Sequence, residues 1–544
     1  MRVDIFLNIN NYMNTANDNV HDVLDMNNYR VEKLKKNKKE GFEKWMEWAG
    51  GPLAVLVFVL IYFFADISFL NNISPDLLKG DALKRFGDLG SDGFSRINYA
   101  MLAIFAASIV LWITEAIPNY LTSLLVIITM VLTGVTSEKL AYAQLGHPVM
   151  WLNILSFVLA SMLVKTRVAK RFALWFVIRF GKNATWIFIS FIVINVVLSV
   201  FISATTAKAT ILLPIFMVIA AIYGATPDKR NNFGRNIVLQ NLFQINIGAS
   251  GFITGSGANL LAGSLIAGAM GMSMFGFQDW FFAAFPLCLL IIIIGWIVGT
   301  KIIFPMKPGE RIPQIEGGME RLRQEYTLLG KMKTEEFKAI AIFLIVLLLW
   351  ATDKQHGISQ TAVAFMGAVV ALLPGIGIVK WNDVDIPWHL MLFSAGAYTL
   401  GAGLEVTDLP AIMVDFVFSH FGITAETPFW VLYLGLTFVM IFSGIFFQSK
   451  TMRALIFVPI AIGIAQKFGY PIMSLSFPVA LLIEHVYVLP FNSKPAALLY
   501  TTNHYSISDT FKFGITMVII SWLLIIIWGE TMLHWLGYTP NGVF

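Results

Sequence analysis

The chain has 544 residues, of which 57% are hydrophobic and 13% charged, and its mean hydropathy is +0.72. A soluble domain of ordinary composition carries about 25% charged residues, so the composition excludes that class. The single cysteine, Cys288, excludes an intrachain disulfide framework, and no Cys/His zinc cluster can be built. The net charge of +5 is spread over several polar stretches, which indicates membrane topology rather than a nucleic-acid surface.

The N-terminal region is polar and basic. We expect residues 1–50 to form a cytoplasmic tail, because the basic run at 30–44 precedes the first apolar segment. No cleavable signal peptide is expected. The apolar run 52–70 predicts a first span that exits outward, and we assign 51–97 to this helix and an outer loop.

The next segment, 98–305, consists of apolar runs, and two of the longer ones are interrupted by polar or glycine-rich residues. The interruptions are "SATTAK" at 203–208 and "GASGFITGSGAN" at 248–259. The polar, proline- and glycine-containing stretch 306–335 then predicts a cytoplasmic linker. The predicted runs are 98–117, 119–137, 149–166 (continuing into an amphipathic 170–182), 184–223, 236–266 and 280–305.

The second half, 336–544, repeats the pattern of the first. Its predicted runs are 336–351, 359–376, 386–420, 428–466 (broken at "QSKT"), 474–500 (broken at "LPFNSKPA") and 512–536. Motif pairs recur in the same order and at nearly equal spacing, which indicates an internal repeat. They are "LWITE" at 111–115 with "LWATD" at 349–353, "TTAKATILLP" at 205–214 with "KTMRALIFVP" at 450–459, and "SGAN" at 256–259 with "SKPA" at 493–496.

The repeat predicts the topology. If 184–223 and 428–466 are re-entrant hairpins, each half crosses the membrane an odd number of times, so the halves are inverted. Lysines and arginines concentrate around the first hairpin and in the linker, as expected of cytoplasmic segments. We therefore predict an all-α polytopic membrane protein of about eleven transmembrane helices, in two inverted repeats with two re-entrant hairpins.

Non-helical backbone within a membrane is tolerated only where protein buries it or a wet cavity borders it. Hairpin tip 1 (203–206), hairpin tip 2 (448–451), helix break 1 (251–259) and helix break 2 (490–495) should therefore meet near the membrane midplane. Helix starts at such points offer free N–H groups to an anion. The candidate substrate-binding residues are Thr205, Thr206, Lys208, Ser256, Asn259, Ser449, Lys450, Thr451, Arg453, Asn492, Ser493 and Lys494.

Lysine and arginine dominate the charge of this set, which favours an anionic ligand such as a carboxylate. Lys208 and Arg453 stand at the same spacing before Pro214 and Pro459, which snorkelling to an interface would not require. Glu484 and His485 are a candidate proton-coupling pair, and a satisfied structural pair is the alternative.

The motif "WITEAIP" at 112–118, the tips ending in "ILLP" and "IFVP", and the paired breaks resemble the divalent anion/sodium symporter family. The resemblance covers about 98–536. It implies a homodimer, a fixed scaffold and a transport domain that moves as an elevator. It also implies substrates among dicarboxylates, citrate and sulfate, with sodium ions bound at the tips and breaks, and a location in the cell (inner) membrane.

The chain departs from the family pattern at the tips. Tip 1 has Ala204-Thr205-Thr206 and tip 2 has Ser449-Lys450-Thr451, where the family usually has Ser-Asn-Thr. A lysine at a sodium site repels sodium, so we expect sodium-independent anion exchange of di- or tricarboxylates, with no cofactor. The alternative is a sodium-coupled dicarboxylate or sulfate symporter. An intramembrane enzyme lacks a catalytic motif, and a cation antiporter would need buried carboxylates at the breaks.

Overall fold

The computed structural model describes residues 24–29 and 41–544, apart from 79, 182, 273–274, 316, 385, 421–426 and 448. The predicted basic tail therefore lies largely outside the described residues. Every regular element in the described part of the chain is helical. Among the described residues, 6 helices are long and apolar enough to cross a membrane: Lys44–Phe64, Gly80–Thr114, Glu138–Lys165, Thr205–Ile222, Phe277–Ile303 and Ile507–Trp535.

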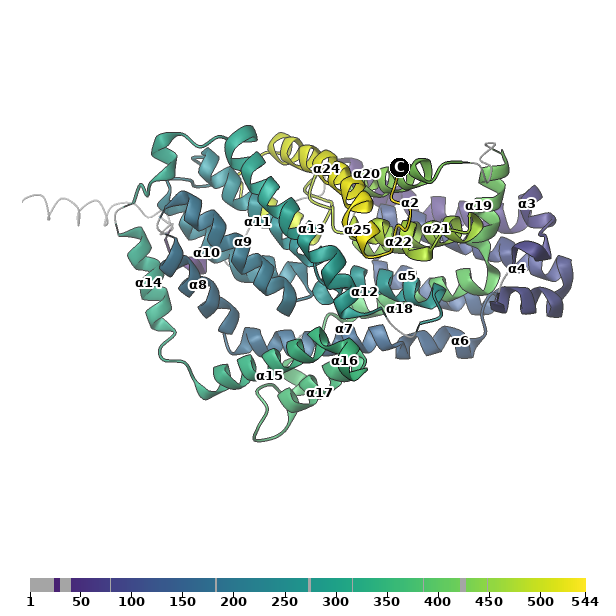
Figure 1. Cartoon of the computed structure of the whole chain (residues 1–544), viewed down its shortest axis with the longest axis horizontal. Coiled ribbons are helices and arrows are strands. Elements are labelled where there is room, and N and C mark those ends of the chain that lie inside the picture. The colour runs from purple at the N-terminus through teal and green to yellow at the C-terminus, as the bar shows by residue number, and fades with distance from the viewer. Residues whose placement is uncertain are drawn as a thin grey trace, which may run out of the picture.

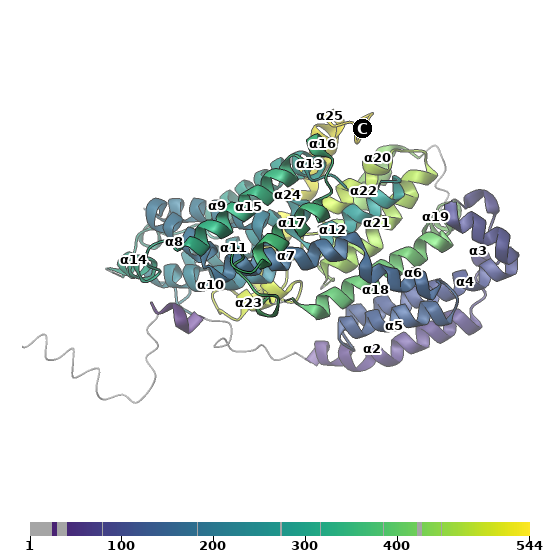
Figure 2. The same cartoon turned by 90° about the horizontal axis from the view of Figure 1, so that it is seen from below.

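One end of the molecule is a helical bundle of N-terminal helices with helices from the middle of the chain (Figures 1 and 2). Helix α18 packs against α4 and α5, and α2 packs against α4. Gly396 permits the close approach of α18 to α5, because a Cβ there would lie 2.3 Å from that of Ser123. The members are α2 (Gly41–Val59, continued by Leu60–Phe64), α4 (Gly80–Thr114), α5 (Asn119–Leu132), α18 (Trp388–Thr407) and α19 (Leu409–His420).

Two predicted boundaries in this bundle are wrong. The segment 71–96 is not simply a loop, since α4 begins at Gly80 and bends at Gly90, whose φ of 70° is open to glycine. The run 386–420 is divided at Asp408, a left-handed residue between α18 and α19. The segment 71–96 is rich in polar residues and glycine, and Asp408 lies within a longer apolar run, so hydropathy reveals neither the early start of α4 nor the break between α18 and α19.

The first-half helices follow the predicted runs closely. Helices α9 and α10 meet at tip 1, and α11 and α12 are separated within break 1 by a turn and a short 3-10 helix, Ile253–Gly255. Helix α10 is long enough to cross a membrane, so length alone does not distinguish a crossing helix from an arm of a re-entrant hairpin. The bounds are α7 (Pro148–Lys165), α8 (Val168–Phe180), α9 (Ala184–Phe201), α10 (Thr205–Ile222), α11 (Asn232–Ser250), α12 (Gly257–Ala269) and α13 (Phe277–Ile297).

The linker is partly helical and is fastened to the first half. Its helix α14 (Gly318–Leu328) packs against α8. Arg171 of α8 binds Glu336 through Nε and Nη2 at 2.5 and 3.0 Å, and it also donates to the carbonyls of Leu329 and Gly330. This forked ion pair holds the start of α15 (Thr334–Ala351) against α8.

The second half ends in helices that match the predicted runs, with one difference. Helix α22 stops at Leu481, so the unwound segment extends over 482–493 and begins well before break 2. The run is apolar, and hydropathy alone therefore predicts a continuous helix there. The bounds are α17 (Gln360–Leu372), α20 (Phe429–Ser443), α21 (Lys450–Lys467), α22 (Ile472–Leu481), α23 (Lys494–Tyr500) and α24 (Ile507–Glu530).

The two halves interlock rather than stand apart. Helix α12 packs against α21 and α22, and α10 packs against α23. Figure 2 shows α12 beside α21 and α22 in the middle of the molecule, with α23 next to α10. Break 1 therefore lies beside tip 2, and tip 1 lies near break 2.

Candidate functional site

A cavity of about 1550 Å³ lies where the tips and breaks meet. Of the predicted set, the residues that line it are Thr205, Thr206, Ser256, Ser449, Lys450, Thr451, Ser493 and Lys494. These residues come from both halves of the chain. The convergence predicted from the sequence therefore holds for these eight positions, whereas Lys208, Asn259, Arg453 and Asn492 are not among the lining residues.

Helices α10, α12 and α21 all begin at this cavity, so their positive dipole ends face it. The Ser256 hydroxyl accepts from the Asn259 N–H at 3.3 Å, and the Ser449 hydroxyl accepts from the Met452 N–H at 3.4 Å. Helix α10 differs, because its N-cap, Ala204, has no side chain that can accept a hydrogen bond. The first-turn N–H groups of α10 are thus the ones left for an anion.

Lys450 of tip 2 contacts tip 1 directly and is linked to break 1 through Glu484. Its ammonium forms a short ion pair with Glu484 and lies 3.4 Å from the Thr205 hydroxyl. Glu484 accepts a second short hydrogen bond, from Ser256. A buried carboxylate from the unwound segment therefore balances the Lys450 ammonium.

Lys494 differs from Lys450 in its surroundings. It is exposed to the cavity, and no ion-pair or hydrogen-bond partner is seen for it among the described residues. Its ammonium is the cation most open to a ligand from the cavity.

Lys208 and Arg453 are both fully buried and act within their own hairpins. Lys208 Nζ donates to Ser199 Oγ on α9 at 2.9 Å, and Arg453 Nε donates to Ser443 Oγ on α20 at 3.1 Å. Each cation therefore ties the two arms of a hairpin together behind its tip. Neither residue lines the cavity, so their predicted contact with substrate stays a prediction, and their equal spacing matches this shared structural position.

Arg453 also supports the unwound segment 482–493. Its guanidinium donates to the carbonyls of Ile483 at 2.7 Å and of Leu482 and His485 at 3.3 Å, and to Met440. These bonds replace the helical hydrogen bonds that α22 would otherwise continue. The segment can therefore unwind although its side chains are apolar.

Asn259 and Asn492 serve the backbone of the breaks. Asn259 Nδ2 donates to the carbonyls of Ala249 and Phe252 at 2.9 and 3.0 Å, and Asn492 Nδ2 donates to that of Ile445 at 2.9 Å. Neither side chain lines the cavity, and their predicted contact with substrate stays a prediction. The Asn259 Oδ1 atom, however, is buried without a hydrogen-bond partner among the described residues, as is Thr254 Oγ1.

Glu484 and His485 are neighbours with separate partners. Glu484 binds Lys450 and Ser256, whereas His485 Nδ1 contacts the Leu482 carbonyl at 3.2 Å. The His485 Nε2 atom has no hydrogen-bond partner within the described part of the chain. No hydrogen bond joins the two side chains among the described residues, and proton coupling by this pair stays a prediction.

Sequence reasoning missed part of the cavity wall. Asn153 of α7 lines it beside Gly257, where a Cβ would meet Asn153 Oδ1 at 3.3 Å. Lys165 and Asp383 also line it and pair at 3.0 Å, and this ammonium holds the pKa of Asp383 below its usual range. Glu115 lines the cavity too. An asparagine within the apolar run 149–166 was the available signal.

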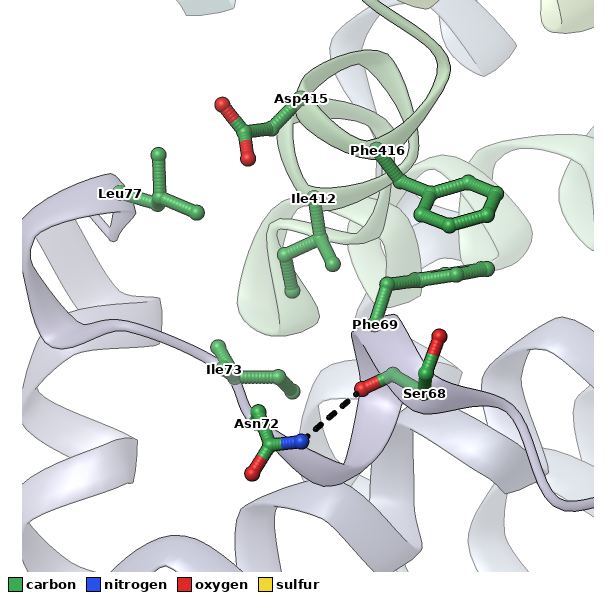
Figure 3. Close-up of a pocket in the computed structure, with 8 residues that line it drawn as sticks. All are labelled: Ser68, Phe69, Asn72, Ile73, Leu77, Ile412, Asp415 and Phe416. Atoms are coloured by element: carbon green, nitrogen blue, oxygen red, sulfur yellow. Dashed lines mark hydrogen bonds between the residues drawn. The ribbon is translucent and has the colours of Figure 1, made fainter. Parts of the chain in front are cut away.

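A second, smaller pocket of about 240 Å³ lies between α19 and the segment 68–77 (Figure 3). Its walls are mainly apolar, with Phe69 against Phe416 at 4.5 Å between ring centres. The charged residue among those lining it is Asp415, which pairs with Lys467 at 2.9 Å. A carboxylate wall does not suit an anion, so the large cavity is the candidate site.

Comparison with known families agrees with this geometry. Residues 90–539 match the sodium:sulfate symporter transmembrane region. The chain belongs to the sodium:sulfate symporter family. The resemblance drawn from "WITEAIP" and the tips is thereby confirmed, and the protein is a multi-pass membrane transporter rather than an enzyme.

Relatives within this family support the same placement. A "Membrane protein" of Cupriavidus necator is 26% identical over 82% of this chain and 89% of its own length. The sodium-dependent dicarboxylate transporter SdcS of Staphylococcus saprophyticus is 25% identical over 80% of this chain and 86% of its own. The sodium-dependent high-affinity dicarboxylate transporter 3 of Caenorhabditis elegans is 25% identical over 74% and 77%.

Proposed function

We propose that this protein is a secondary transporter that carries small dicarboxylates across the membrane. The observation that carries the proposal is the cavity at which α10, α12 and α21 begin and into which Lys450 and Lys494 project. Helix starts and ammonium groups there favour an anion. A dicarboxylate has two charged ends, which suit the uncapped start of α10 with Lys450 at one end and Lys494 at the other.

The names of the relatives support sodium coupling. Unwound helices in transporters coordinate sodium through oxygen atoms, and break 1 holds the unpartnered Asn259 Oδ1 and Thr254 Oγ1. Sodium-independent exchange is the second candidate, and the ammonium of Lys450 at tip 2 favours it. The case for sodium-independent exchange is weaker, because Glu484 already balances the Lys450 ammonium.

The inverted repeats, the elevator movement and the homodimer belong to the same proposal. The N-caps Ser256 and Ser493 support repeat equivalence, because their backbone angles are −155° and 156°, and −156° and 156°. Impermeant thiol labelling tests the topology, since Cys288 is the only cysteine and is buried. Lys331→Cys should be shielded in intact cells and Asn541→Cys labelled; ready labelling of Lys331→Cys would refute the inverted arrangement.

Transport by purified protein in liposomes tests the function. We expect labelled succinate to enter vesicles under an inward sodium gradient, and unlabelled succinate to compete better than a monocarboxylate or sulfate. Uptake that persists in potassium but requires internal succinate would select the exchanger. Preferential competition by sulfate would replace the dicarboxylate with sulfate.

A further inference from the structure

We propose that Glu484 is a built-in counter-anion that holds the Lys450 ammonium while no substrate is bound and yields it to a substrate carboxylate. The inference rests on the proposed transport function and deepens it. It explains how a carrier with a cation at its binding site can return empty.

The placement of the two side chains supports this exchange of partners. Lys450 lines the cavity and its side chain is 13% exposed, whereas Glu484 is fully buried and is not among the lining residues. A substrate carboxylate therefore approaches Lys450 from the cavity, while Glu484 holds it from behind. The contact of Lys450 with Thr205 places the same ammonium beside the uncapped start of α10.

Glu484 is held where it can reach Lys450. Ser256 at break 1 donates to one carboxylate oxygen, and Lys450 at tip 2 binds the other. Arg453 fixes the backbone on both sides of Glu484 through the carbonyls of Ile483 and His485. The carboxylate is thus positioned by neighbours from both halves, and it stays in place when Lys450 turns toward a ligand.

The surrounding charges make this carboxylate important. Lys208 on α10 and Arg453 on α21 lie within electrostatic range of Glu484, as does its partner Lys450. Without Glu484, the empty site would present these cations with no compensating carboxylate from the unwound segment. A substrate dianion would then be required for each crossing of the apolar barrier, because uncompensated charge is costly there.

Two assays on the full-length protein in liposomes separate empty return from loaded exchange. The first measures net uptake of labelled succinate into vesicles without internal succinate, and the second measures exchange into vesicles loaded with it. Glu484→Gln should keep exchange but lower the ratio of net uptake to exchange at least about tenfold. Glu325→Gln, the same change in the Lys170–Glu325 pair away from the cavity, should leave the ratio unchanged.

The double variant Lys450→Met/Glu484→Gln removes the pair as a unit. At saturating succinate its ratio should return to within about threefold of the original protein, because removing one positive and one negative charge together leaves the net charge of the site unchanged. This variant decides the question if Glu484→Gln does not fold.

An unchanged ratio in Glu484→Gln, an equal loss in both assays, or a double variant whose ratio stays low would overturn the counter-anion role. If the unaltered protein moves succinate in neither assay, the proposed function fails and the inference falls with it.

Discussion

The two halves of the site use the same backbone with different chemistry. At break 1 and break 2, Ser256 and Ser493 cap a helix with nearly identical angles. At the tips and breaks, the first half lines the cavity with uncharged groups such as Thr205 and Thr206, whereas the second half contributes Lys450 and Lys494. The comparison teaches that both halves supply helix starts, and that their side chains then give each half a different charge.

The buried cations behind the tips show the same division. Lys208 and Arg453 both bind a serine on the preceding helix, but only Arg453 also gathers carbonyls from the unwound segment. A guanidinium has five donors in a fixed fork and an ammonium has three, so the second half can support a longer unwound segment.

Among the changes that test this difference between the halves, replacing Lys450 should have the largest effect on substrate binding. Lys450→Met leaves Glu484 buried without its ion-pair partner, and its negative charge then repels the substrate. We expect a loss of about 2–5 kcal/mol in dicarboxylate binding, which abolishes uptake at micromolar substrate. Binding of succinate to the purified protein measures this. Affinity within a factor of two or so of the original would remove Lys450 from the site.

Replacing the cations behind the tips should lower the stability of the protein rather than its affinity for substrate, and by different amounts in the two halves. Arg453→Met strands several buried carbonyls, and we expect a destabilisation of about 3–5 kcal/mol. Lys208→Met, the matched change in the first half, loses one hydrogen bond to Ser199 and should cost about 1 kcal/mol. Thermal unfolding in detergent compares them. Equal losses would contradict the division of roles.

The first half should control sodium dependence. Asn259→Ala removes the unpartnered Oδ1 and two hydrogen bonds to break 1, so the sodium concentration for half-maximal uptake should rise about tenfold, or ~1.4 kcal/mol. Asn492→Ala, which removes an asparagine from the unwound segment of the second half, is the control and should not shift the sodium curve. An equal rise of the half-maximal sodium concentration in both variants would contradict a sodium site in the first half alone.

The exposed cation should have the smallest effect. Lys494 contacts the cavity without a partner among the described residues, and exposed charge pairs are worth about 0.2–1 kcal/mol. Lys494→Met should therefore raise the KM for succinate only a few-fold, and the difference should shrink at high ionic strength. Complete loss of transport would place Lys494 on a level with Lys450.

The tips and breaks were predictable because they interrupt long apolar runs. Polar residues such as Thr205 and Ser256 within a membrane segment are costly unless they line a wet cavity, so their position alone indicates a site. Asn153 was missed because it stands singly in an apolar run, although it lines the same cavity. Arg453 was assigned to the substrate because its charge is visible in the sequence, whereas the carbonyls that it binds are not.

The sequence by itself determined the class, the helical runs, the four interruptions and the family, because hydropathy and motif order depend on local residues. Only the tertiary structure decided which charged side chains face the cavity and which bind other groups within the protein. Lys450 pairs with Glu484, and Glu484 accepts a hydrogen bond from Ser256, although these three residues lie far apart along the chain. Which pairs form depends on how α12 packs against α21, and no local pattern in the chain encodes that contact.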